Sequence, residues 1–334
     1  MKDNHDKLGI ALLGLGKYAT GQLAPAFEHT NHCYLAGVVS GSPDKAIEWQ
    51  KKYDLPPANI YNYDNFESIK NNPAIQVVYV VTPNATHADF VVRAASAGKH
   101  VICEKPMATT VEDCDRMIAA CAKAGVMLSI GYRLRFEPYN REMMRLGATQ
   151  KYGPVQKIIA KDGLDGTEGW RLNKQLAGGG PLMDVGIYCL QAANYTSALK
   201  PVAVKAQEGP KTNPETFAQI EQSVSFQLEY PGGYTADCEC SYDQEMNFLH
   251  ADASNGWFEL QPAFSYKGIR GRNAQGEMHF EEVVQQAAEM DSIALAIKNK
   301  QPSPVPGEMG REDVKILLAI YKAMESGERQ LLTQ

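Results

Sequence analysis

The chain has 334 residues, of which 44% are apolar and 22% are charged, and its formal net charge at pH 7 is −6. A chain of this length can form two domains with their own cores, and its negative charge gives no electrostatic reason to bind nucleic acid or an anionic membrane. No run of about 18 apolar residues is present, so no membrane span is expected. The seven cysteines show no C-x-x-C spacing. They suit free thiols in a reducing compartment, and with the polar N-terminus they predict a cytoplasmic protein.

The first third of the chain alternates two kinds of segment. Continuous apolar, β-branched runs occupy residues 8–14, 34–40, 75–82, 100–104 and 126–132. Continuous apolarity is typical of strands that are buried on both faces of a parallel sheet. Helical patterns lie between these runs, for example at 87–99 and 111–125. The repeated β-α-β order predicts a doubly wound α/β domain over residues 1–131.

The remaining residues, 132–334, have a different pattern. Apolar and polar positions alternate at residues 155–163, 202–208, 223–230, 234–242 and 256–262. Such period-two strands predict a second, α+β domain with a predominantly antiparallel sheet that has one covered and one open face. Helical patterns occur at 181–199, 283–299 and 311–326. The open face of the sheet is a candidate surface for a homodimer or homotetramer.

A glycine-rich turn follows the first strand. Its pattern is Gly14-x-Gly16-x-x-Ala19, in which the first glycine permits a tight turn, the second lets the backbone approach a pyrophosphate, and the small third residue lets helix and strand pack closely. Free backbone N–H groups at the start of the following helix would face the phosphates. We therefore expect a dinucleotide-binding (Rossmann) domain. The turn residues expected to bind the cofactor are Gly14, Leu15, Gly16, Lys17 and Tyr18.

The end of the second strand indicates which cofactor is bound. An acidic residue there would bind the ribose 2′-hydroxyl and repel a 2′-phosphate, but this chain has Ser40 and Gly41, followed by Lys45. A hydroxyl and an ammonium suit a 2′-phosphate, which favours NADP over NAD. Ser42 can also cap a helix that starts at the next residue, with Lys45 merely solvated, and Asp44 could reach a ribose hydroxyl instead.

Three further stretches carry residues suited to chemistry: TPNATH (82–87), CEKPM (103–107) and GGGPLMDVGIYCLQ (178–191). The first two follow strands, at the sheet edge where doubly wound folds bind ligands. Lys105 is conformationally restricted because a proline follows it. Asp184 and Tyr188 are four residues apart and are expected on one face of a helix.

Together, GLGKYA, EKP and GGGPLMDVGIY resemble the Gfo/Idh/MocA family of sugar and polyol oxidoreductases. WR at 170–171 and PGEMGREDVKILLAIYKA near the C-terminus extend the resemblance over nearly the whole chain. Most of the family has histidine where this chain has Tyr188. This departure, with GYRLRFEP (131–138) and SGSPDK, is most similar to the glucose–fructose oxidoreductase branch, which uses tyrosine and NADP.

The resemblance implies a role for each matching residue. Lys105 would lie beside the nicotinamide and the reacting carbon, Asp184 would bind the sugar, and Tyr188 would exchange the proton. Glu104 and Pro106 would fix Lys105, with a cis peptide before the proline. The other residues implied at the cofactor are Thr82, Pro83, Asn84, His87, Trp170, Arg171 and Arg133, although Arg133 stands where many relatives have asparagine.

The chemistry of these residue types agrees with that assignment. Oxidising a carbinol needs a base for the hydroxyl proton, and a free tyrosine with a pKa of about 10 becomes a better base beside an ammonium group. We therefore expect an NADP-dependent sugar oxidoreductase, either with a freely exchanging cofactor or with retained NADP that passes hydride between two sugars. Alternatives are a nucleotide-sensing regulator without turnover and a reductase for a non-sugar carbonyl. No metal is expected, because His29 and His32 lack further candidate ligands.

Overall fold

The computed structural model describes residues 6–332, which fold into two compact units. The first unit runs to Arg133 and resumes over Val284–Arg311, and the second comprises Leu134–Val283 and the chain from Glu312 onward. The division expected from the sequence was contiguous at residues 131/132. It therefore did not include the return of residues 284–311 to the first unit.

The first unit contains a six-stranded parallel sheet in the order β3-β2-β1-β4-β5-β6. Its strands are β1 (Leu8–Leu13), β2 (Cys33–Val39), β3 (Ile60–Tyr61), β4 (Val77–Val80), β5 (His100–Glu104) and β6 (Leu128–Gly131). The order of the strands reverses at β1 and β4: β2 and β3 are added on one side of β1, and β4, β5 and β6 on the other. Doubly wound sheets bind ligands at such a switch point, beyond the carboxyl ends of the strands. The Rossmann fold expected from the continuous apolar runs is thus confirmed.

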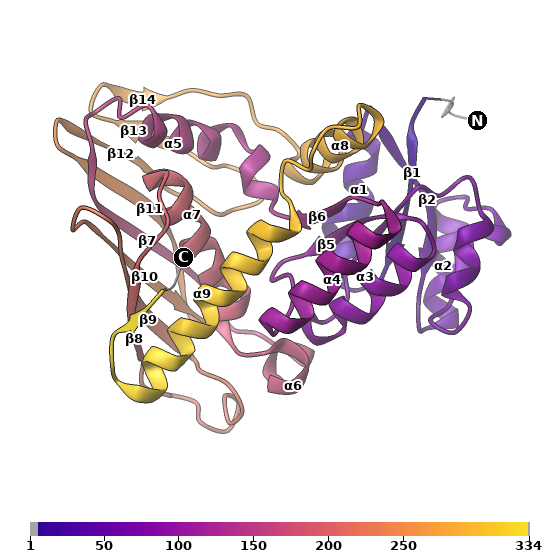
Figure 1. Ribbon diagram of the computed structural model, residues 1–334, viewed down its shortest axis with the longest axis horizontal. Coiled ribbons are helices and arrows are strands. Elements are labelled where there is room, and N and C mark those ends of the chain that lie inside the picture. Colours follow the sequence, from indigo (N-terminus) through magenta and orange to yellow (C-terminus); the bar gives the residue numbers. More distant parts are fainter. Residues whose placement is uncertain (1–5, 333–334) are drawn as a thin grey trace. The chain divides into compact units, whose positions relative to one another are not determined.

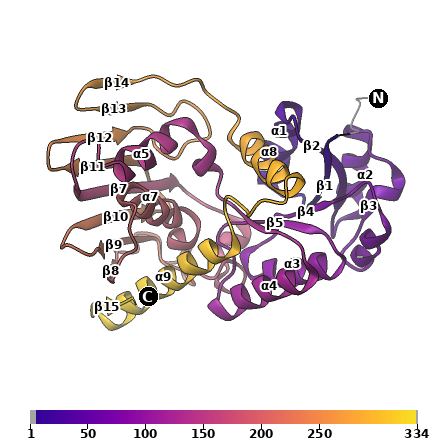
Figure 2. The ribbon, with the colours of Figure 1, turned by 45° about the horizontal axis from the view of Figure 1, so that its top comes forward.

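Helices cover both faces of this sheet, which is why all four residues of β4 are buried. The helices are α1 (Ala24–Ala26), α2 (Pro43–Lys52), α3 (His87–Ser96), α4 (Val111–Ala124) and α8 (Gln285–Lys298). Figure 2 shows α3 and α4 on one side of the sheet and α1 and α8 on the other. The late helix α8 packs against β2 and against the π-helical turn Ala19–Leu23.

The second unit contains a nine-stranded sheet in the order β14-β13-β12-β11-β7-β10-β9-β8-β15. Its strands are β7 (Val155–Asp165), β8 (Ala203–Glu208), β9 (Ser223–Glu229), β10 (Thr235–Ser241), β11 (Asp243–Ala253), β12 (Gly256–Leu260), β13 (Gly271–Asn273), β14 (Gly276–Met278) and β15 (Gln330–Leu331). All neighbours pair antiparallel except β7 and β10, which are parallel. The predominantly antiparallel sheet expected from period-two strands is therefore confirmed.

One face of the second sheet is covered by helix α7 (Ile187–Ser197), and α5 (Pro138–Ala148) packs against α7 (Figure 1). Alternation along β7 follows from this cover: Ile158 and Ala160 are fully buried beneath the helix, whereas Lys157 on the other face is exposed. Among residues 6–332 the other α-helices are α6 (Lys174–Ala177) and α9 (Gly307–Ser326).

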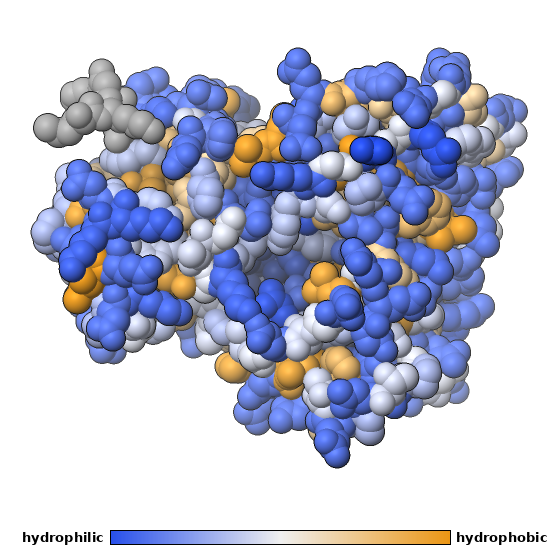
Figure 3. Space-filling view, turned by 180° about the vertical axis from the view of Figure 1, so that it is seen from behind, coloured by the Kyte–Doolittle hydropathy of each residue, from blue (hydrophilic) through white to orange (hydrophobic). Residues whose placement is uncertain are grey.

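Most of the molecular face in Figure 3 is hydrophilic, with hydrophobic residues in small separate groups. Scattered exposed apolar residues are ordinary for a globular protein. Across residues 6–332, no helix has the length and apolarity needed to cross a membrane.

Candidate active site

The two glycines of the first turn differ in what the fold requires of them. Gly14 has φ of +100°, and a Cβ there would lie 2.5 Å from the carbonyl oxygen of Val81, so the fold itself needs glycine. A Cβ at Gly16 would meet no protein atom within 4 Å. Packing within the protein therefore does not require glycine at position 16, whereas the close approach of a pyrophosphate at this helix start would require it. Of the other turn residues, Leu15 is buried, Tyr18 is half-buried and Lys17 is exposed.

The end of β2 carries the residues expected at the 2′-phosphate. Ser40 is buried, and its Oγ accepts a hydrogen bond from the backbone N–H of Ser42 at 3.1 Å. Ser42 in turn accepts from the backbone N–H of Lys45 at 3.4 Å and caps α2. The capping interpretation is thus correct, and it leaves the side chains of Lys45 and Asp44 exposed on the first turn of α2. Capping and phosphate binding by Lys45 are compatible.

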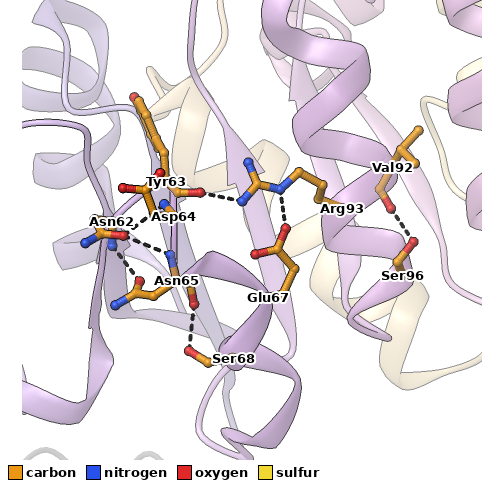
Figure 4. Close-up of polar contacts among 9 residues, drawn as sticks. All are labelled: Asn62, Tyr63, Asp64, Asn65, Glu67, Ser68, Val92, Arg93 and Ser96. Atoms are coloured by element: carbon orange, nitrogen blue, oxygen red, sulfur yellow. Dashed lines mark hydrogen bonds and ion pairs between the residues drawn. The ribbon is translucent and has the colours of Figure 1, made fainter.

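Tyr63 lies against Gly41. No sequence pattern indicated this contact, because the two residues are 22 positions apart and Tyr63 is in a loop. A Cβ at Gly41 would approach the Tyr63 ring to 2.7 Å. Figure 4 shows how that loop is fixed: the Asn62 side-chain oxygen accepts the N–H groups two and three residues on, at 2.9 and 2.8 Å. Arg93 donates to the Tyr63 carbonyl and pairs with Glu67 at 2.5 Å. The Tyr63 ring, held by this loop, therefore borders the end of β2.

His87 joins the loop after β4 to the loop after β5. Its side chain is fully buried, with Nε2 2.9 Å from the Thr82 carbonyl and Nδ1 3.1 Å from the Pro106 carbonyl. Burial lowers the pKa of His87, and hydrogen bonds to these carbonyls oppose that shift. A fully buried ring favours this joining role over the cofactor-lining role expected from the sequence. In the same loop, Thr82 and Asn84 are buried and Pro83 is half-buried.

Lys105 follows β5 directly, and its peptide bond to Pro106 is cis, as the resemblance implied. Its backbone N–H donates to Glu104 Oε2 at 3.2 Å. The other carboxyl oxygen of Glu104 lies 2.8 Å from the Tyr79 hydroxyl. The Lys105 backbone is therefore held by a buried carboxyl group, while its side chain is half-buried.

Helix α8 supplies partners for two predicted cofactor residues. Arg133 is buried and donates to the side-chain oxygen of Gln285, and Gln286 lies within hydrogen-bonding distance of the Tyr18 hydroxyl, at 3.5 Å. Sequence reasoning missed these glutamines because they lie more than 150 residues from Arg133 and form no recognised motif. The helical pattern at 283–299 was the sole signal for them.

In the second unit, Asp184 is held by two donors on one oxygen. Arg171 Nε is 2.7 Å from Asp184 Oδ2, and the Tyr242 hydroxyl is 3.0 Å from the same atom. The Asp184 charge raises the pKa of Arg171 despite the opposing effect of burial, and the guanidinium lies 4.9 Å from the centre of the Trp170 ring. The structure thus brings Trp170, Arg171 and Asp184 together, and it adds Tyr242, which the sequence did not indicate.

The segment that carries Asp184 and Tyr188 begins with a π-helical turn, Leu182–Gly186, and continues as α7. The helical pattern expected at 181–199 thus includes a π turn, which bonds i to i+5 and shifts the side chains around the axis, so the spacing of four between Asp184 and Tyr188 is not that of a regular α-helix. Tyr188 is half-buried, and its ring stacks on Phe264 with 6.2 Å between the centroids.

Packing explains the glycines ahead of this segment. A Cβ at Gly179 would lie 1.9 Å from the Tyr321 hydroxyl, and one at Gly180 would lie 2.4 Å from the Glu221 carbonyl. Glu221 Oε1 accepts from the N–H groups of Gly180 and Leu182, at 2.9 and 3.3 Å, and from Tyr321 at 2.6 Å. This buried carboxyl group fixes the backbone two residues before Asp184.

The predicted residues thus form two sets. Gly14 to Tyr18, Ser40, Gly41, Lys45, the loops at 82–87 and 104–106, and Arg133 belong to the first unit; Trp170, Arg171, Asp184 and Tyr188 belong to the second. Within the described part of the chain, no group of three or more His, Cys, Asp or Glu residues could hold a metal ion.

Comparison with known proteins places both units in one family. A model for the oxidoreductase family with an NAD-binding Rossmann fold (GFO_IDH_MocA) matches residues 8–132, and the GFO/IDH/MocA C-terminal domain model matches residues 141–259. The crystal structure of aldose–aldose oxidoreductase from Caulobacter crescentus, complexed with glycerol, has a TM-score of 0.95 and 41% identity. That match covers 98% of this chain and 100% of the other.

Two curated relatives are more distant. D-xylose 1-dehydrogenase [NADP(+)] of Haloarcula marismortui is 28% identical over 95% of this chain and 91% of its own. Trans-1,2-dihydrobenzene-1,2-diol dehydrogenase of Bos taurus is 27% identical over 72% of this chain and 68% of its own. The chain therefore belongs to the Gfo/Idh/MocA family and is an NAD(P)-dependent oxidoreductase that acts on CH–OH groups.

Proposed function

We propose that this protein transfers a hydride between NADP and a sugar (an aldose, a keto-sugar or a related polyol), with Tyr188 as acid/base and Lys105 assisting it. The observation that carries the proposal is the 41% identity, over nearly the whole chain, to a protein named aldose–aldose oxidoreductase. Lys105 after β5 and Tyr188 on α7 are the acid–base residues that such chemistry needs.

The end of β2 supports NADP as the cofactor. Ser40 stands where an acidic residue would repel a 2′-phosphate, and the Lys45 side chain is exposed one turn further on. Asp44 is exposed beside it and would weaken the preference without removing it. The relative from Haloarcula marismortui is also named as an NADP(+) enzyme.

In this proposal each site residue has a defined task. NADP, when bound, would supply the hydride acceptor or donor. Tyr188 would take the proton from the reacting sugar hydroxyl, or return it in the reverse direction, and the Lys105 ammonium would favour the phenolate. Asp184, fixed by Arg171 and Tyr242, would accept a hydrogen bond from a further sugar hydroxyl.

We also propose that the open face of the second sheet forms a homodimer or homotetramer. It carries ion pairs between neighbouring strands, such as Lys157–Asp237 at 3.0 Å and Lys161–Glu239 at 2.7 Å. The rings of His250 on β11 and Trp257 on β12 of the same sheet stack, with 6.0 Å between their centroids. Aromatic residues are enriched in interfaces, whereas Lys, Asp and Glu are depleted from the interface core and suit its polar rim. All seven cysteines are free and buried, which supports a reducing, cytoplasmic location.

The test is absorbance at the reduced-nicotinamide band of the purified protein, with a panel of aldoses added without and then with NADP. A sugar should raise this signal, and Lys105→Ala and Tyr188→Phe should abolish the rise while still binding NADP. A rise without added cofactor indicates retained NADP and transfer from sugar to sugar. Nucleotide binding without turnover of any sugar, in either direction, overturns the proposal in favour of a sensor or of a non-sugar diol or carbonyl substrate, as the name of the Bos taurus relative suggests for that protein.

A further inference from the structure

Two buried glutamates of the first unit meet at one tyrosine hydroxyl. Tyr79 Oη, on β4, lies 2.8 Å from Glu104 Oε1 on β5 and 3.2 Å from Glu289 Oε2 on α8. Tyr79 and Glu289 have no exposed surface. A Cβ at Gly131 would lie 2.9 Å from the Glu104 carboxyl and 3.1 Å from the Tyr79 hydroxyl, so protein fills the space around this contact.

Counting hydrogens favours a neutral state for one of these carboxyl groups. A phenol carries one hydrogen and an ionised carboxylate carries none. The Tyr79 hydroxyl can therefore donate to one carboxyl oxygen, and its contact with the other is a hydrogen bond if that carboxyl group is protonated and donates to the phenol oxygen. Two ionised carboxylates would leave one buried oxygen–oxygen contact without a proton, and they would repel each other in a site of low dielectric.

The partners of each carboxyl group identify Glu289 as the neutral one. Both oxygens of Glu104 face donors, namely Tyr79 and the Lys105 backbone N–H. Glu289 Oε1 is buried with no hydrogen-bond partner among the described residues, which is far costlier for a carboxylate than for the carbonyl oxygen of an acid. Burial raises the pKa of both groups, but in Glu104 the Lys105 charge and the hydrogen bonds from Tyr79 and the Lys105 N–H oppose the shift. In Glu289 burial and the Glu104 charge raise the pKa well above its usual range, against the opposing effects of Tyr79 and Arg133.

We propose that Glu289 is a neutral carboxylic acid at physiological pH and a positioning residue for Lys105. Its proton is donated to Tyr79, which turns the single Tyr79 proton toward Glu104. Glu104 remains the ionised member and holds the Lys105 backbone. The second part, a role for this chain of hydrogen bonds in turnover, rests on the proposed function of Lys105. The protonation of Glu289 does not.

The first experiment is the infrared difference between the full-length wild-type protein and Glu289→Gln at neutral pH. The variant should lose the carbonyl stretch of one protonated carboxylic acid. Glu137→Gln is the matched control. Glu137 is also buried, but its carboxylate accepts hydrogen bonds from the N–H groups of Tyr139 and Asn140, at 3.1 and 2.8 Å. This control variant should therefore lose a carboxylate band instead. Loss of a carboxylate band in Glu289→Gln overturns the proposal, whatever the enzyme turns over.

The second experiment measures proton uptake on folding. A glutamate with a raised pKa in the folded state binds more protons than in the unfolded chain, so its contribution to stability falls as pH rises above the ordinary value of 4.5 toward the raised one. Within that window, one proton changes the folding constant about tenfold per pH unit. Glu289→Gln should remove this dependence in urea unfolding. An identical pH slope in the wild type and the variant contradicts the assignment.

The third experiment tests positioning through the proposed turnover. Glu289→Met cannot donate to Tyr79 and should lower kcat about tenfold, with little change in the KM for NADP, whereas Glu289→Gln, whose amide still donates, should restore it. Tyr79→Phe breaks the same chain of hydrogen bonds and replaces the methionine variant in this test if that variant does not fold. Equal kcat in the methionine and glutamine variants overturns the positioning role. Failure of the wild type to oxidise any sugar counts against the proposed function, and the infrared comparison still decides the charge of Glu289.

Discussion

Replacing Gly14 and Gly16 separately by alanine should show that the fold needs glycine at position 14 and that cofactor binding needs glycine at position 16. At Gly14, alanine would adopt φ near +100° and place its Cβ 2.5 Å from the Val81 carbonyl oxygen. Left-handed strain of about 1–2 kcal/mol and overpacking of about 1–3 kcal/mol give a loss of roughly 2–5 kcal/mol in the free energy of unfolding. At Gly16, a Cβ would meet no protein atom within 4 Å, so we expect a change within about 0.5 kcal/mol.

Cofactor affinity should follow the opposite order when both variants are compared in the folded state. The methyl group of Gly16→Ala would occupy the space into which the pyrophosphate is expected to approach, and the Kd for NADP should rise at least about tenfold, or about 1.4 kcal/mol. Urea unfolding followed by circular dichroism measures the first quantity, and calorimetric titration with NADP measures the second. Gly16→Ala that binds NADP like the wild type, or that unfolds as readily as Gly14→Ala, would refute this reasoning.

Three further substitutions test other parts of the site. Lys45→Glu should raise the Kd for NADP about tenfold and leave that for NAD nearly unchanged, as measured by the same titration. Tyr321→Phe removes the 2.6 Å hydrogen bond to Glu221 and should lower the free energy of unfolding by about 1–2 kcal/mol in urea. Tyr242→Phe removes the hydroxyl that, with Arg171, donates to Asp184 Oδ2, and should lower kcat/KM for the sugar about three- to tenfold, the kinetic equivalent of one hydrogen bond.

Each of these has a result that would count against it. Lys52→Glu, at the last residue of α2, is the charge-matched control for Lys45, and an equal loss of NADP affinity in both would mean a general electrostatic effect. Unchanged stability of Tyr321→Phe would show that Glu221 does not need its hydroxyl partner. Unchanged sugar kinetics in Tyr242→Phe would remove Asp184 orientation from the proposed mechanism.

Local patterns predicted the elements that are defined by short stretches of chain. Continuous apolar runs indicated β1, β2, β4, β5 and β6, because a strand that is buried on both faces has no solvent-facing positions for polar side chains. The two-residue strand β3 and the long β11 were not expected. The strand β3 is too short to show a period. Four of the first six residues of β11, DQEMNF, are polar, which hides its alternation.

Long-range packing was less accessible to sequence reasoning. Helix α8 is apolar or small on most sides, and nothing in its pattern indicates that it packs in the first unit, against β2, rather than in the second. The same limit applies to Tyr63 beside Gly41 and to Tyr242 on Asp184, because each contact joins a motif to a residue that carries no motif of its own. Sequence motifs identified the candidate site residues, whereas the residues that orient them could be recognised only in the folded structure.

Transfer of deuterium tests the central claim most directly. The protein would be incubated with NADP and a panel of aldoses deuterated at every carbon, and the recovered nucleotide examined by mass spectrometry. The account predicts that one aldose gives reduced NADP carrying one deuterium, and that Tyr188→Phe gives none while still binding the cofactor. Tight binding of NADP with no deuterium on the nucleotide or on any added acceptor sugar would contradict it.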